Sequence, residues 1–202
     1  MDFYAHNSVA VLAFPPDAGY PRLTMAVLAE LGDLLNEVRL SGLFRGVVIA
    51  SNPRSFATGA RIEEVASVEG VGARAFAQKG QLIFNRIASF PLAVVAAIRG
   101  YCLGGGLDLA LACHARLATY DASFGHPGAS LGLITGWGGI QRLTRLIGRT
   151  AATQLLLTAE RVPASQALTL GLVDELVPSS DLVEAAARRA LSVARQPVPP
   201  GG

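Results

Sequence analysis

Short apolar runs alternate along the chain with longer segments in which apolar residues recur with helical periodicity. A short apolar run that is bounded by turn residues predicts a buried strand. Such runs occur at residues 9–14, 47–50, 92–98 and 115–119. Strands that are buried on both faces and separated by helices pair in parallel. The pattern therefore predicts a single α/β domain.

Amphipathic segments between and after these runs predict helices. In residues 23–38, the apolar side chains fall on one helical face and Thr24 can cap the first turn. These apolar residues are Leu28, Leu31, Leu35 and Val38. Further helices are predicted at residues 73–88, 138–147, 151–158, 164–170 and 182–194, and one from the glycines at 104–106 to about residue 113.

The composition indicates extensive burial. Hydrophobic residues make up 51% of the 202 residues and charged residues 16%, which favours a large core and a subunit interface. We assign residues 1–196 to one domain and expect the Pro- and Gly-rich residues 197–202 to form a disordered tail. Apolar runs are shorter than the roughly 20 residues of a membrane span. The first residues do not resemble a signal peptide, so a cytoplasmic protein without a membrane partner is expected.

Charge and cysteine content exclude other classes of protein. The formal net charge is +2, from 17 basic and 15 acidic residues, which gives no indication of nucleic-acid binding. Arg142, Arg145 and Arg149 form a basic cluster that we interpret as a solvated helix face. Cys102 and Cys113 lie in apolar surroundings without metal-ligand spacing, so we expect buried free thiols and no metal site.

Two glycine-containing junctions are candidates for chemistry. Residues 56–61 (FATGAR) follow the second predicted strand, and residues 101–108 (YCLGGGLD) lead from the third into a helix. The first N–H groups of a helix have no partner within the helix, and they can bind an anion or a developing oxyanion where glycines leave them accessible. The sequence lacks the dinucleotide fingerprint and the P-loop at this point. Taken alone, the glycines are better explained by close packing of the helix on the strand.

Further motifs extend the pattern. Residues 99–110 read RGYCLGGGLDLA, residues 124–127 read FGHP, and residues 136–143 read GWGGIQRL. Together with residues 56–61 and 155–173, they follow in order the conserved segments of one enzyme superfamily, over residues 9 to 195. The chain thus resembles the crotonase (enoyl-CoA hydratase/isomerase) superfamily.

The resemblance implies a ClpP/crotonase-like spiral of repeated ββα units, here lacking the usual C-terminal helices because the chain ends early. It also implies an acyl-CoA or acyl-carrier thioester as substrate, no cofactor other than the coenzyme A of that substrate, and a homotrimer or hexamer. The N–H groups of Ala60 and Gly105 would form the oxyanion hole, and Asp108 would be the catalytic carboxylate. The substrate-binding residues would be Ala57, Ala60, Arg61, Ile62, Glu63 and Gly105.

The chain departs from the family pattern at several positions. Gly128 stands where hydratases of the family carry their second catalytic glutamate. His126 lies two residues before it and is a candidate alternative base, although a hydrogen-bonded structural histidine is the simpler explanation. Trp137 fills the variable position of the G-x-G-G segment, where packing is the simpler explanation. Arg22 is a candidate contact for a phosphate of coenzyme A.

Two functions follow from these observations. The first is an enzyme of fatty acid metabolism, a lyase or isomerase that forms an enolate with one carboxylate. Isomerisation, decarboxylation or thioester hydrolysis would suit such a site better than hydration, which normally needs two carboxylates. The second is a non-catalytic protein or partner subunit that binds an acyl thioester.

Overall fold

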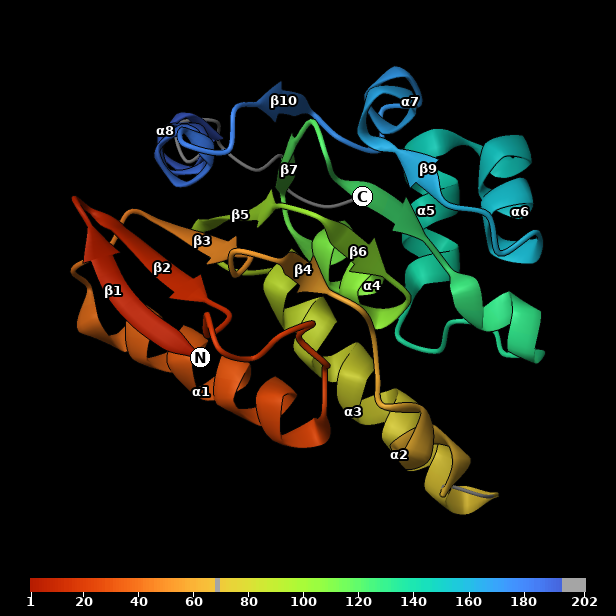
Figure 1. Cartoon of the computed structure of the whole chain (residues 1–202). Helices are drawn as coiled ribbons and strands as arrows, with labels where there is room; N and C mark the ends of the chain where they lie inside the picture. The colour runs from red at the N-terminus through yellow and green to blue at the C-terminus, as the bar shows by residue number, and fades with distance from the viewer. Residues whose placement is uncertain (68–69, 194–202) are drawn as a thin grey trace.

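The computed structural model describes residues 1–67 and 70–193 (Figure 1). The predicted tail at residues 197–202 lies outside this range. A six-stranded sheet runs through the described residues in the order β1-β2-β3-β5-β7-β10. All neighbouring strands are parallel except β1, which pairs antiparallel with β2 at the edge. Its strands are β1 (Asp2–His6), β2 (Val9–Ala13), β3 (Gly46–Ala50), β5 (Ala93–Ile98), β7 (Ala115–Thr119) and β10 (Glu175–Val177).

A second, smaller sheet has the order β4-β6-β8-β9. Its strands are β4 (Ser55–Ala57), β6 (Tyr101–Leu103), β8 (Ser123–Gly125) and β9 (Val162–Pro163). Each long central strand of the first sheet is followed by a short strand of the second and then by a helix. The chain thus repeats a β-β-α unit through β3-β4, β5-β6 and β7-β8. This confirms the predicted α/β spiral.

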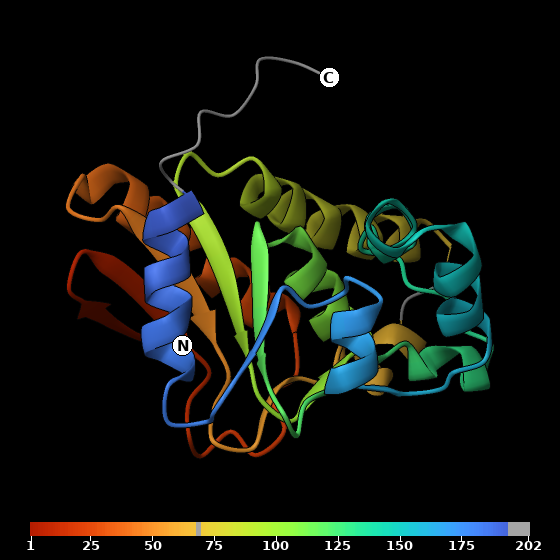
Figure 2. The same ribbon diagram turned by 90° about the horizontal axis from the view of Figure 1, so that it is seen from above.

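Helices cover both faces of the larger sheet. On one side lie α1 (Met25–Ser41) and α3 (Val71–Ala88), and α4 (Gly105–Ala112) is buried on every side from Gly106 onward. On the other side α8 (Leu182–Val193) lies over β3 and β5 (Figure 2). An added Cβ on Gly46 of β3 would lie only 2.8 Å from the Cβ of Ala190, so small residues set this close approach.

The remaining helices gather at the end of the molecule away from β1 and β2 (Figures 1 and 2). They are α5 (Gly139–Ile147), α6 (Arg149–Leu157) and α7 (Ala164–Thr169), and the short helices α2 (Ile62–Ala66) and η1 (Pro127–Leu131) complete the described elements.

The predicted strands and helices are confirmed, but several further strands were not predicted. All four predicted strands occur as β2, β3, β5 and β7, and the predicted helices occur within a few residues of their expected bounds. We expected only helices after residue 119, which is wrong because β8, β9 and β10 lie there. These strands have two or three residues each, too few to show a period, and tertiary pairing alone specifies them. Cys102 and Cys113 are buried free thiols, as expected.

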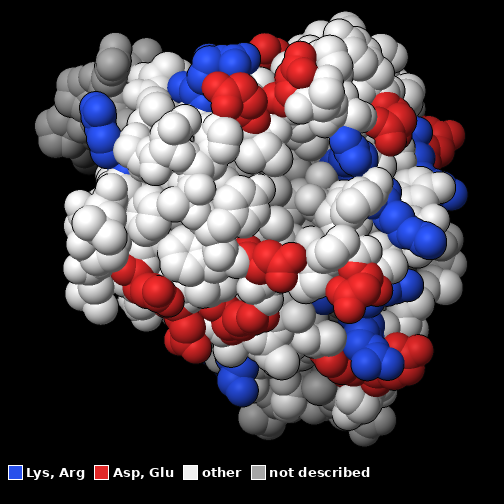
Figure 3. All heavy atoms as spheres, turned by 60° about the vertical axis from the view of Figure 1, so that its left-hand side comes forward, with Lys and Arg blue, Asp and Glu red and all other residues white. Residues whose placement is uncertain are grey.

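The surface carries both signs of charge. On the face that Figure 3 shows, acidic and basic side chains stand in small groups around a broad uncharged area. This distribution accords with the near balance of charge in the sequence and gives no sign of a continuous basic surface on the described part of that face.

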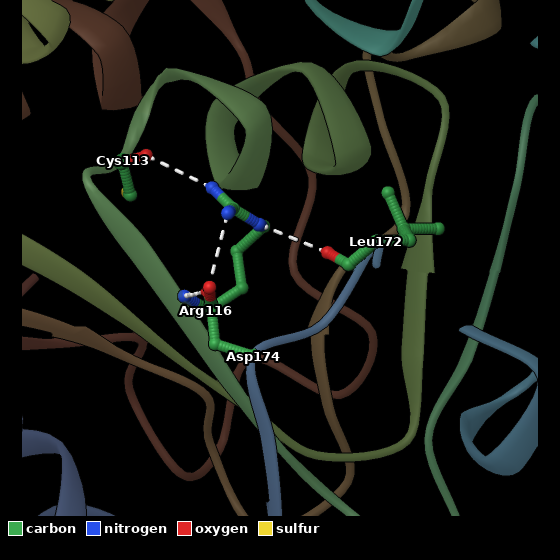
Figure 4. A network of polar contacts seen from close by, with 4 residues as sticks. All are labelled: Cys113, Arg116, Leu172 and Asp174. Atoms are coloured by element: carbon green, nitrogen blue, oxygen red, sulfur yellow. Dashed lines mark hydrogen bonds and ion pairs between the residues drawn. The ribbon is translucent and has the colours of Figure 1, made fainter. Parts of the chain in front are cut away.

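A partly buried ion pair ties the C-terminal part to the large sheet (Figure 4). Arg116 of β7 bonds to Asp174, with 3.1 Å between Nη2 and Oδ2, and its backbone N–H donates to the same oxygen at 2.7 Å. The guanidinium also donates to the carbonyls of Cys113 and Leu172, at 3.0 and 2.9 Å. Because the side chain of Arg116 is only 6% exposed, these bonds fix the segment that leads from α7 to β10.

We expect Arg116→Met to lower the free energy of unfolding by about 3 kcal/mol, because it keeps the apolar stem but leaves a partly buried carboxylate and two carbonyls without their donor. Urea denaturation measures the change. Arg188→Met is the control, since Arg188 makes an exposed pair with Glu184 that is worth at most about 0.5 kcal/mol. Equal effects of the two substitutions would contradict the structural role of Arg116.

Candidate active site

The parallel pairing of β4 with β6 brings the two glycine-containing junctions together. Ser55 pairs with Tyr101 and Ala57 with Cys102, so the segments that follow these strands leave the sheet side by side. An added Cβ on Gly59 would lie 3.1 Å from the backbone N of Gly105. The structure therefore places the loop that carries Ala60 against the first residue of α4.

The N-terminus of α4 presents its backbone to this loop. Gly104 precedes the helix with φ of 54°, a left-handed conformation that favours glycine, and its N–H donates to the carbonyl of Gly125 at 2.8 Å. The first helical hydrogen bond runs from Asp108 N to Gly104 O at 3.1 Å. The N–H of Gly105 thus belongs to the first turn, where donors have no intrahelical acceptor and the helix dipole is positive.

Backbone hydrogen bonds hold the loop with Ala60 in place. Thr58 N donates to Pro21 O and Leu23 N donates to Gly59 O, both at 2.9 Å. These bonds bring the segment with Arg22 to the same place as Arg61. An open cavity of about 550 Å³ lies there. Arg22, Arg61, Ile62 and Glu63 are among its lining residues.

Ala57, which the resemblance placed on the substrate channel, is fully buried. It packs against α4 at Gly106, where any Cβ would collide with the carbonyl of Ala57. Neither Ala57 nor Gly105 nor Asp108 lines the cavity beside Arg61. The cavity and the N-terminus of α4 are therefore neighbouring features, joined through the backbone at residues 59–61.

Asp108 lies in the first turn of α4 and is 1% exposed. Its carboxylate faces the N-terminus of α5, where a Cβ on Gly139 would collide with Oδ1. Thr135 Oγ1 donates to Oδ2. Burial raises the pKa of Asp108 from its ordinary 3.8 to about 7, and the hydroxyl of Thr135, the charge of Arg142 and the backbone of Trp137 partly oppose this rise. A carboxyl group with a pKa near 7 can both accept and return a proton at neutral pH.

His126 faces the same carboxylate from the end of β8. Its Nε2 lies 3.6 Å from Asp108 Oδ1, and its side chain is 5% exposed. Burial lowers the pKa of His126 from 6.5 to about 4, which favours the neutral imidazole. Neither Nε2 nor Oδ1 has a hydrogen-bond partner among the described residues.

Trp137 packs between two helices. Its ring lies against Gly105 of α4, where an added Cβ would be 2.5 Å from Cζ3, and against Gly80 of α3, where a Cβ would collide with the indole. The rings of Phe76 and Phe84 lie 5.4 and 5.7 Å away, and Trp137 is 4% exposed. The indole thus fills the space beside Gly105, as a packing role would require.

Gly128, the position of the absent second carboxylate, lies in η1 and is half-buried. An added Cβ would meet the Cβ and the carbonyl oxygen of Leu133 at 3.5 Å, an ordinary contact distance. The backbone could therefore carry a side chain here without strain.

Sequence reasoning missed Thr135 and misjudged Arg142. Arg142 does not lie on a solvated helix face, because its Nη1 donates to Trp137 O at 3.0 Å and its Nη2 to Asn85 Oδ1 at 2.6 Å. It is half-buried and anchors the loop that carries Trp137. Both roles depend on where the fold places residues 135–139. The motif at residues 136–143 does not indicate that position.

Among residues 1–67 and 70–193, no group of three or more His, Cys, Asp or Glu side chains is arranged to hold a metal ion. Within the same residues, no helix has the length and apolar character needed to cross a membrane.

Comparisons with known proteins agree with the motifs. The sequence profile of the enoyl-CoA hydratase/isomerase family matches residues 5–199. The chain is 41% identical over 174 residues to the fatty acid oxidation complex subunit alpha of Shewanella baltica (strain OS185), covering 84% of this chain and 25% of the relative. For the same subunit of Shewanella halifaxensis, the identity is 42% over 167 residues, covering 81% and 24%. The chain thus spans about a quarter of the length of these relatives.

Solved structures are similar over a larger share of their length. The enoyl-CoA hydratase of Bacillus anthracis superposes with a TM-score of 0.88 at 32% identity, covering 96% of this chain and 76% of that one. DspI of Pseudomonas aeruginosa gives a TM-score of 0.88 at 32% identity, covering 97% and 75%. At this identity and overlap, the similarity extends beyond the general fold.

The shifted pKa of Asp108 predicts a pH-dependent stability. Because the pKa in the folded state, about 7, is above its ordinary 3.8, the folded chain keeps a proton that the unfolded chain releases. Stability from this group is complete below about pH 4 and is lost as pH rises to 7, by up to about 4 kcal/mol. Asp108→Asn does not titrate. We therefore expect denaturation to show this variant gaining stability over the wild type between pH 4 and pH 8. A pH-independent difference would contradict the burial of an ionising carboxyl group.

Proposed function

The chain belongs to the enoyl-CoA hydratase/isomerase family, and from this premise we propose that it binds an acyl-CoA or another acyl thioester and forms its enolate by proton transfer to Asp108. The observation that carries the proposal is the buried Asp108 carboxylate, one helical turn after the first N–H group of α4, which has no acceptor within the helix. Its pKa of about 7 suits a base that must also return the proton.

In the proposed step, Asp108 removes a proton from the carbon next to the thioester carbonyl. The electron pair of the broken C–H bond forms a C=C bond, and the carbonyl π pair moves to oxygen as the enolate. The N–H groups of Ala60 and Gly105 would donate to that oxygen. One such donor is typically worth about 3–4 kcal/mol in the barrier. Return of the proton to another carbon of the acyl chain completes an isomerisation.

The coenzyme A part would occupy the cavity beside the loop with Ala60. Arg22 and Arg61 both line it and are exposed, so they can approach phosphate groups. Ile62 and Glu63 lie on the same wall. The proposal requires no cofactor beyond the coenzyme A of the substrate, and a homotrimer or hexamer remains a prediction of the resemblance.

Gly128 decides which reaction we favour. Addition of water to a double bond normally uses two carboxylates, and glycine provides none. The proposal is therefore a single-carboxylate enzyme, foremost an isomerase, rather than a hydratase. Decarboxylation and thioester hydrolysis are the other single-carboxylate reactions, and they would not begin with removal of the α-proton. The names of the relatives from Shewanella support a role in fatty acid metabolism.

A non-catalytic acyl-thioester-binding protein is the second candidate. The glycine at position 128 favours it, because a chain that only binds a thioester needs no second carboxylate. The buried carboxylate of Asp108 counts against it, since burial of an ionisable group costs stability and such a cost is more readily explained where the group has a function.

Exchange of the α-proton tests the proposed step directly. The wild type is incubated in D2O with a panel of acyl-CoAs, namely crotonyl-CoA, a 3-enoyl-CoA, a malonyl-type CoA and a 3-hydroxyacyl-CoA. Mass spectrometry follows deuterium uptake and product, and calorimetry follows binding. We expect Asp108→Asn to lose about 100-fold or more of exchange while binding is retained. Asp121→Asn, at an exposed position, is the matched control. Binding without exchange by the wild type would favour the non-catalytic protein.

Restoring a carboxylate tests the role of Gly128. Because a side chain fits here, we expect Gly128→Glu to raise the hydration rate of crotonyl-CoA about 10-fold or more over the wild type. Gly128→Gln has the same size without the charge and should leave the rate unchanged. Ultraviolet absorbance of the enoyl thioester measures both rates. An equal rate for the two variants would show that the missing carboxylate does not limit hydration.

A further inference from the structure

Two buried polar atoms face each other beside the candidate active site without a hydrogen bond. Asp108 Oδ1 and His126 Nε2 are 3.6 Å apart, slightly beyond hydrogen-bond distance, and their side chains are 1% and 5% exposed. Neither atom has another partner among the described residues. Buried polar groups of folded proteins are nearly always paired, so such a pair requires an explanation.

The neighbouring polar side chains among the described residues are bonded to other atoms and not to Oδ1 or Nε2. Thr135 donates to Oδ2, the other oxygen of the carboxylate. The side chain of Arg142 is bonded to Trp137 O and Asn85 Oδ1. Cys102, which approaches from β6, is a buried thiol whose own pKa is raised by burial, and it is therefore neutral. Within the described residues, the imidazole is thus the basic group that faces Oδ1.

We propose that His126 is a positioning residue that works through Asp108, its Nε2 accepting a hydrogen bond from the proton that Asp108 removes from the acyl carbon. This inference rests on the proposed function. It assigns to an imidazole two residues before Gly128 part of the work that a second carboxylate would do. The pair would accept one proton in total, shared between a carboxylate oxygen and a ring nitrogen.

The proton balance of the step is simple. Before reaction the carboxylate is ionised and the imidazole neutral. The proton from the acyl carbon forms an O–H bond at Oδ1 while the C–H pair becomes the enolate. A small approach of the two side chains then lets this O–H donate a hydrogen bond to Nε2 of the neutral imidazole. The reverse path returns the proton to the substrate.

A purely structural histidine would behave differently. It would contribute volume and shape, which glutamine nearly reproduces, so proton exchange and its pH profile would survive that substitution. The chain has three histidines, so the ring signals can be assigned by substitution. The two other histidines serve as references, because His6 is partly exposed and pairs with Glu184, and His114 accepts from Val94 N.

The first experiment is a pH titration of the ¹⁵N-labelled histidine rings by NMR. In the wild type, we expect the ring nitrogens of His126 to shift with a midpoint near pH 7, where Asp108 ionises. This step should disappear in Asp108→Asn. Ring shifts that are identical in the two proteins would overturn the proposal. The titration needs no substrate, so its result stands even if the proposed function fails.

The second experiment is α-proton exchange of a saturated acyl-CoA in D2O by His126→Gln. We expect the exchange rate to fall about 10-fold or more, with the Kd of the acyl-CoA within about 2-fold of the wild type and a changed pH profile. His6→Gln is the matched control and should exchange normally. Unchanged exchange and pH profile in a folded His126→Gln would overturn the inference. No exchange by the wild type itself would instead overturn the proposed function. Should His126→Gln fail to fold, the NMR comparison decides alone.

Discussion

The contact between backbone segments at the ends of β4 and β6 is the constraint on which the rest of the site depends. It is possible only because Gly59 and Gly106 carry no side chain, since a Cβ on Gly106 would collide with the carbonyl of Ala57. The parallel pairing of the two strands aligns the loop with Ala60 and the start of α4. The repeated β-β-α unit generates this alignment, so the geometry of the site is a property of the whole spiral.

A second constraint on the site is the burial of the Asp108 carboxylate. A carboxyl group enclosed by α4 and α5 is stable when protonated and costly when ionised. Thr135 and Arg142 reduce this cost without removing it, so the pKa of Asp108 remains near 7. A residue placed only for stability would have no reason to keep such a balance, and the raised pKa therefore supports the role proposed for Asp108.

The sequence was informative where a pattern is long or where an ordered motif exists. The strands β2, β3, β5 and β7 follow from continuous apolar runs, and the closeness of Gly105 to the loop at Ala60 follows from the ordered motifs. The burial of Asp108 against Gly139 could not be derived, because it depends on how α5 approaches α4. The same holds for Arg142, whose helical spacing suggests solvent but whose guanidinium reaches a carbonyl of the preceding loop. Short strands such as β8 and β9 carry too few residues to show any period.

The indole wedged between Gly80 and Gly105 has an optical consequence. The chain holds a single tryptophan, and that residue is nearly solvent-free and touches the first residue of α4. Its emission therefore comes from one location, so the spectrum has no background from other indoles. Unfolding brings the ring into water and shifts the emission to longer wavelength. A molecule seated against Gly105 alters the polarity around the same ring, so one unlabelled fluorophore reports both the integrity of the fold and the occupancy of the site.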